Sequence, residues 1–65
     1  MWYFTFMFKD EGKRDYIVKI NEKQYNVARK IMFDLFGVEW AFQYDEKEGE
    51  QIIKDYGYKI IDVSV

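Results

Sequence analysis

Alternating apolar and polar positions at the start of the chain predict a β-hairpin. In residues 2–9 (WYFTFMFK), aromatic side chains recur at every second position, a period that is typical of a strand. Residues 15–20 (DYIVKI) alternate in the same way, with Val18 and Ile20 on one face. The polar segment between these strands contains Gly12, which can supply the positive φ of a turn. The two segments therefore predict an antiparallel pair.

A helical period replaces the alternation after residue 20. Apolar residues recur at spacings of three and four between residues 25 and 36, which predicts an amphipathic helix. Asn21 is a favourable N-cap and Gln24 stands three positions later, as in a capping box, so we expect the helix to begin at Asn21. Gly37 predicts the end of this helix, with a positive φ.

A third strand is expected at residues 39–44, where aromatic side chains again occupy every second position. Its aromatic residues are Trp40, Phe42 and Tyr44. Because they share one face of a regular strand, we expect all three to be buried, with Trp40 and Phe42 under the first helix. Whether this strand pairs with residues 2–9 or with residues 15–20 stays open.

A second helix and a final strand complete the pattern. Asp45 is a good N-cap with Glu48 three positions later, and Gly57 predicts the helix end, again with a positive φ. Residues 59–65 alternate and form the last strand. The order ββαβαβ predicts one α+β domain over residues 1–65, with a four-stranded sheet. We expect both helices to be packed on one face, because so short a chain offers little material for a third layer.

The composition limits the functions that the chain can carry. The 65 residues include neither cysteine nor histidine, which removes disulfides and the commonest zinc ligands and general base. Ser64 is the only serine and the glycines are scattered singly, so neither a nucleophilic triad nor a phosphate-binding loop is indicated. We expect no enzyme activity, no cofactor and no metal. No segment approaches the roughly 20 apolar residues of a membrane span and no signal peptide is evident, so we expect a cytoplasmic protein.

Charge is distributed unevenly although the net charge is only −2. Residues 1–30 carry a formal charge of +3 and residues 31–65 a charge of −5. The acidic residues at the start of the second helix are Asp45, Glu46, Glu48 and Glu50. They form either a capped and solvated helix start or a partner-binding surface that imitates nucleic-acid phosphates in a basic groove.

A second candidate surface is the sheet face that the helices are expected to leave open. This face would present Tyr3, Met7 and Ile17, which form either ordinary exposed surface or a patch for a protein partner or a second copy of the chain. Tyr3 could also stack on the bases of a single strand, but one aromatic residue and one lysine make a weak platform. A nucleic acid is therefore not the expected partner.

Several residues in the middle of the chain match a known pattern. Ala28-Arg29, Met32-Phe33, Phe36-Gly37, Trp40-Ala41-Phe42 and Tyr44 resemble a family of small open reading frames of unassigned function in phages and mobile elements of Gram-positive bacteria. The resemblance carries no catalytic residues. It implies an accessory protein that acts in the cytoplasm of a bacterial host. Such a protein would bind and modulate a host protein, for example a host-defence nuclease, as an anti-CRISPR inhibitor does.

Two other hypotheses differ from this one in class. The chain could be a single-stranded nucleic-acid-binding domain that uses the hairpin and Tyr3. It could also be a structural subunit that forms a homodimer through the open sheet face.

Overall fold

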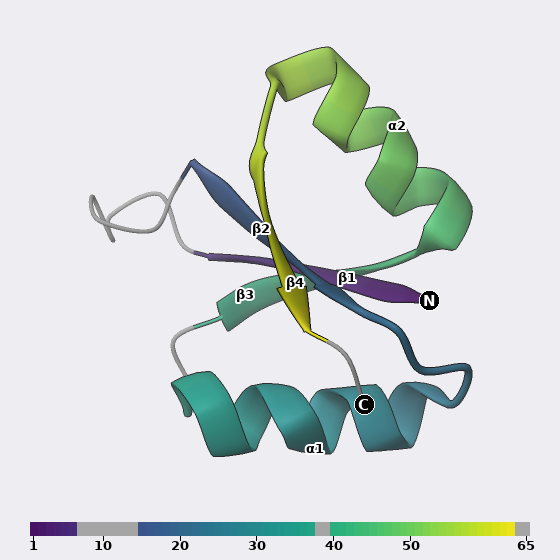
Figure 1. Ribbon diagram of the computed structural model, residues 1–65, viewed down its shortest axis with the longest axis vertical. Helices are drawn as coiled ribbons and strands as arrows, with labels where there is room; N and C mark the ends of the chain where they lie inside the picture. Colours follow the sequence, from purple (N-terminus) through teal and green to yellow (C-terminus); the bar gives the residue numbers. More distant parts are fainter. Residues whose placement is uncertain (7–14, 38–39, 64–65) are drawn as a thin grey trace.

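A computed structural model describes residues 1–6, 15–37 and 40–63. The strands are β1 (Trp2–Phe6), β2 (Tyr16–Ile20), β3 (Trp40–Asp45) and β4 (Lys59–Val63), and the helices are α1 (Tyr25–Phe36) and α2 (Glu46–Tyr56) (Figure 1). The predicted α+β class and element order are thereby confirmed. The predicted continuation of the first strand to residue 9, and of the last to residue 65, lies outside the described residues.

The strands form one mixed sheet in the order β3-β1-β2-β4. β1 is antiparallel to both of its neighbours, while β4 runs parallel to β2 at the other side of the sheet. The pairing that the sequence left open is therefore between β3 and β1. β3 and β4 are the two edge strands.

The two helices lie on opposite faces of the sheet, so the expectation that both cover one face is wrong (Figure 1). Phe4 and Val18 pack with Ala28 and Met32 of α1. Tyr3 is the neighbour of Phe4 in β1 and therefore points to the other face. Its ring lies directly against α2, where it meets the backbone at Gly49.

The direction of the chain across the sheet explains this arrangement. From β2 to β3 the chain crosses the sheet in one direction through α1, and from β3 to β4 it returns in the opposite direction through α2. Connections between parallel strands are almost always right-handed, so two connections that run in opposite directions place their helices on opposite faces. Each face is also small, because a strand of five residues spans about 17 Å, close to the length of an 11-residue helix.

Aromatic pairs form the core under α1. Trp2, Phe4 and Phe6 of β1 each meet another ring edge-on, at centroid distances of 4.9, 5.1 and 5.2 Å. Their partners are Tyr25, Trp40 and Phe36, respectively, so the pairs tie both ends of α1 and the start of β3 to one strand. Aromatic pairs in this geometry are worth about 0.5–1.5 kcal/mol beyond the apolar area that they bury.

A β-bulge changes the predicted orientation of the aromatic side chains in β3. Phe42 is opposite Thr5, but Trp40 is opposite Phe6, so Ala41 is an extra residue between them. Because the bulge reverses the alternation, Trp40 faces α1 while Phe42 faces the α2 side and is 53% exposed. The expectation that Phe42 is buried under α1 is therefore wrong.

The observed ends of both helices agree with the predictions, whereas the observed start of α1 does not. Gly37 and Gly57 both have positive φ, as predicted. α1 begins three residues later than expected, with Gln24 in place of Asn21 as its N-cap and without a side-chain cap. The backbone N–H of Asn21 donates instead to the carbonyl oxygen of Val63, since the pairing with β4 continues beyond the end of β2.

We predict that Trp40 and Phe42 differ sharply in their effect on stability. Trp40→Ala removes ring contacts to Phe4 and Phe33 and should lower the free energy of unfolding by about 3 kcal/mol. Phe42→Ala changes an exposed side chain and should cost about 0.5 kcal/mol or less. Urea unfolding at low protein concentration measures both values. Equal losses in the two variants would mean that the bulge is misplaced.

We also predict that Gly49→Ala destabilises the protein, although alanine is the better helix former. A Cβ at this position would overlap the ring of Tyr3, and overpacking of this kind costs about 1–3 kcal/mol. The gain in helix propensity is at most about 1 kcal/mol. Gln51→Ala, at an exposed position of the same helix, is the control and should be nearly neutral. A Gly49→Ala protein more stable than wild type would contradict the close packing of α2 on β1.

Candidate functional site

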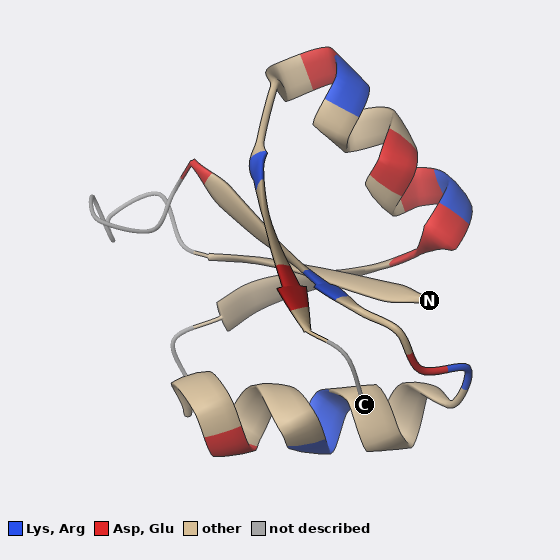
Figure 2. Ribbon diagram, in the orientation of Figure 1, with Lys and Arg blue, Asp and Glu red and all other residues tan. Residues whose placement is uncertain are grey.

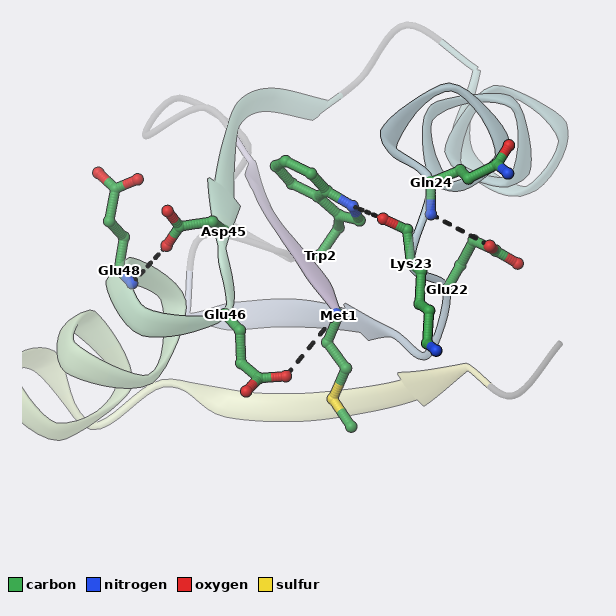
Figure 3. Close-up of polar contacts among 8 residues, drawn as sticks. All are labelled: Met1, Trp2, Glu22, Lys23, Gln24, Asp45, Glu46 and Glu48. Atoms are coloured by element: carbon green, nitrogen blue, oxygen red, sulfur yellow. Dashed lines mark hydrogen bonds and ion pairs between the residues drawn. The ribbon is translucent and has the colours of Figure 1, made fainter.

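The start of α2 is built by a side-chain cap. The Asp45 carboxylate accepts a hydrogen bond of 2.8 Å from the backbone N–H of Glu48 (Figure 3). Glu46 and Glu48 lie in the first turn, where the positive end of the helix dipole stabilises carboxylates. The predicted N-cap is thereby confirmed. The cap fixes the direction in which α2, with its acidic residues, extends from the end of β3.

The four predicted acidic residues do not form one cluster. Asp45 is used in the cap, and the Glu46 carboxylate lies 3.7 Å from the amino group of Met1. In Figure 3, Glu46 and Glu48 extend in different directions from the helix start. Among the described residues, the carboxylates of Glu48 and Glu50 have neither a hydrogen bond nor an ion pair, and both residues are exposed. These two residues are therefore the carboxylates that remain available to a partner.

The acidic character extends along α2 beyond its first turn. Residues 45–56 contain five carboxylates and two lysines, a formal charge of −3. Figure 2 shows acidic segments along this helix, whereas α1 carries fewer charges. The side chains of Gln51 and Asp55 are joined by a hydrogen bond of 3.0 Å, which orders part of the exposed surface. The helix thus presents a negative surface on a regular backbone.

The electrostatic field of this surface acts on Tyr3. Burial raises the pKa of the Tyr3 hydroxyl above its ordinary value of 10.0. The negative charges of Glu50, Glu46 and Asp62, in that order of effect, raise it further. Carboxylates from α2 and β4 are therefore near enough to the Tyr3 hydroxyl to act on its ionisation.

A shallow hollow of about 430 Å³ lies on the other flank, between α2 and β3. Its lining residues are Tyr44, Lys47, Glu48, Gln51 and Ile52. Apolar atoms of the half-buried Tyr44 and Ile52 contribute to this surface. Phe42 points from β3 to the face that α2 covers and is more than half exposed. An exposed aromatic side chain therefore lies next to the hollow.

The second predicted surface is not open. Tyr3 is 1% exposed and Ile17 is fully buried, because α2 covers the face to which they point. The prediction that these residues form an open patch is wrong for that reason. Tyr3 is also unable to stack on a nucleic-acid base. Met7 lies outside the described residues.

Sequence reasoning missed two residues that shape this region. From the sequence, Gly49 only lowers the helix propensity of α2, by about 1 kcal/mol relative to alanine, but its missing side chain lets the helix approach β1 closely. Phe42 was assigned to the core, but it is the exposed side chain next to the hollow. The run Trp2–Phe6 contains four aromatic residues and one small threonine. Such a run, without charged residues on either face, could have indicated a strand buried on both faces.

The described segments show no constellation for metal binding and no helix for crossing a membrane. Within residues 1–6, 15–37 and 40–63, no three carboxylates converge on a point where a metal ion could bind. In the same residues, no helix is both long enough and apolar enough to span a bilayer. Comparison with protein-family models, curated proteins and solved structures finds no match to the chain.

We predict that Tyr3→Phe changes stability at alkaline pH. The pKa of Tyr3 is raised in the folded state, so the neutral Tyr3 hydroxyl contributes to folding stability. This contribution is fully present below the pKa of the unfolded state, about 10, and is lost as pH rises through the pKa of the folded state. Wild type should therefore lose stability above about pH 10 more steeply than Tyr3→Phe. Urea unfolding across this pH range measures the difference. Parallel curves for the two proteins would contradict the raised pKa.

Proposed function

We propose that this protein is a non-catalytic protein-binding module that presents the acidic exposed side of α2 to a basic partner. The observation that carries the proposal is that Glu48 and Glu50 are exposed on a regular helix and have no ion-pair or hydrogen-bond partner for their carboxylates in the part of the chain that the structure describes. The capping of α2 by Asp45 and its close contact with β1 at Gly49 hold the helix backbone that carries these carboxylates in a defined position. A backbone held in place in this way loses little conformational entropy when it binds.

The charge on α2 favours a partner with a positively charged groove. A negative surface attracts such a partner over a distance of about 8–10 Å at physiological salt and raises the association rate. Proteins that bind nucleic acids contain grooves of this kind, because they neutralise phosphates with lysine and arginine. An acidic helix can occupy such a groove and exclude the nucleic acid.

A nuclease of a bacterial host is the partner that we propose on these grounds. The resemblance to small reading frames of phages and mobile elements supports the same class of partner, since such genomes gain from blocking host-defence nucleases. The protein would act by occupancy of the nucleic-acid groove, without chemistry of its own. Inhibition by this mechanism would be competitive with the nucleic acid.

The proposal predicts that Glu50→Lys weakens partner binding by about tenfold or more. The immobilised protein is first used to capture partners from a bacterial host lysate at low and high salt. Affinity is then measured with the purified partner, and nuclease inhibition is measured at several concentrations of DNA. Binding should weaken as salt rises, and added DNA should relieve inhibition.

Asp34→Lys provides the matched control. Asp34 is an exposed carboxylate on α1, and its reversal changes the net charge by the same amount as Glu50→Lys. Asp34→Lys should bind the partner nearly as well as wild type. If both variants bind as wild type does, the acidic start of α2 is only a capped helix terminus and the proposed function is wrong.

A further inference from the structure

The backbone hydrogen bonds of β2 show which groups turn towards each neighbouring strand. The N–H of Lys59 donates to the carbonyl oxygen of Asp15, and the N–H of Asn21 donates to the carbonyl oxygen of Val63. Odd-numbered residues along β2 therefore turn their backbone groups to β4. Since these groups alternate along a strand, the even-numbered residues turn theirs to β1.

The same alternation can be followed across β1 to β3. Phe4 is opposite Val18, an even-numbered residue of β2, so the backbone groups of Phe4 turn to β2. Those of Tyr3 must then turn to β3, where Tyr3 is opposite Tyr44. Tyr44 and Phe42 accordingly direct their backbone groups inward to β1. Gln43, which lies between them, therefore directs both of its backbone groups to the free edge. The regular alternation stops at the bulge at Ala41 and at Asp45, whose carbonyl oxygen begins the hydrogen bonding of α2.

This edge lacks charged side chains, one of the protections that edge strands usually have. Natural sheets discourage unwanted strand pairing with charged residues, short edges and bulges, and of these β3 has the bulge at Ala41. The β4 edge has such protection, because only Ile60 and Asp62 turn outward in a strand that also carries Lys59. The β3 edge has no charged residue between Trp40 and Tyr44. It is therefore the edge at which a further strand can add.

We propose that two copies of this chain associate through β3, antiparallel and symmetric about Gln43. In this register Gln43 of each copy exchanges two backbone hydrogen bonds with Gln43 of the other. Ala41 is opposite Asp45 of the second copy at each end of the contact, where the bulge and the start of α2 end the regular hydrogen bonding. Such a symmetric contact is the commonest form of association between identical chains.

The side chains are complementary in the same register. Phe42 is then directly opposite Tyr44 of the second copy, at a position without hydrogen bonds, where cross-strand side chains approach most closely. Both residues lie on the α2 face, so the exposed Phe42 of each copy reaches the hollow beside Tyr44 and Ile52 of the other. The two-fold symmetry produces two such contacts.

The charges are compatible with this register and not with a parallel one. In the antiparallel pair, Asp45 is opposite Ala41, and the two Asp45 carboxylates lie at opposite ends of the contact. A parallel in-register pair would place Asp45 beside Asp45, which is unfavourable.

The contact involves only five residues of each strand and the hollow, so its area is small and the dimer should be concentration-dependent. Glu50 does not line the hollow and stays available, so this inference does not rest on the proposed partner.

Sedimentation velocity over a concentration series tests the dimer, with two variants of similar exposure. Phe42→Ser should raise the dimer dissociation constant about tenfold or more. Ile60→Ser is the matched control, because Ile60 is 50% exposed, lies on the same face and belongs to the other edge strand. It should dimerise as wild type does. A wild-type chain that stays monomeric at the highest concentration overturns the proposal and leaves the β3 edge to a strand of another protein.

A single cysteine tests the register independently, since the chain contains none. In the proposed pair the two Cα atoms at position 43 are about 5.5 Å apart, within the range that a disulfide spans. Gln43→Cys should therefore form a cross-linked dimer under mild oxidation, much faster than Asp62→Cys on the β4 edge. Equal rates for the two variants would exclude this register.

Discussion

Trp2, Phe4 and Phe6 each meet a ring from a different part of the chain, while Tyr3 and Thr5 between them are buried under the other helix. β1 is thus a central strand that has to fill the layers above and below the sheet at once. The rest of the structure depends on this double burial. α1, the start of β3 and the ring of Tyr25 are held on one face, and α2 is held on the other through Gly49.

The two-sided arrangement also determines which surfaces remain for binding. With a helix on each face, neither side of the sheet is open over its centre, and the two surfaces proposed for binding lie on α2 and at the β3 edge. Gly49 is the only buried residue of α2, so the acidic residues of this helix contribute little to the core. The bulge at Ala41 turns Phe42 out of the core and places it next to the hollow. The surfaces proposed for a partner and for a second copy therefore follow from the same packing.

Much of the fold could be predicted from local signals, because those signals have local causes. The alternation in β1 and β2, the Asp45 cap and the positive φ of Gly37 and Gly57 each depend on a few neighbouring residues. The placement of the helices could not be predicted in the same way. It depends on the strand order, which places β3 and β4 at opposite edges and reverses the direction of the second connection.

The errors at particular residues have the same kind of cause. No residue near Ala41 indicates a bulge, which arises from the pairing of β3 with β1. Asparagine is a favourable residue at an N-cap, but the backbone N–H of Asn21 donates to the carbonyl oxygen of Val63 in the pairing with β4. The acidic candidate residues were correctly located on an exposed helix start, whereas Tyr3 and Ile17 were assigned to a surface that α2 covers. Tertiary contacts decide each of these cases.

The packing of α1 and α2 on opposite faces of β1 is tested most directly by nuclear Overhauser contacts from the α-protons of Gly49, because this residue lies against one identified ring. The structure predicts strong contacts to the ring protons of Tyr3, together with an upfield ring-current shift of the glycine protons. Contacts from Gly49 to the rings of Phe4 or Trp40 would instead place α2 beside α1 and contradict the account.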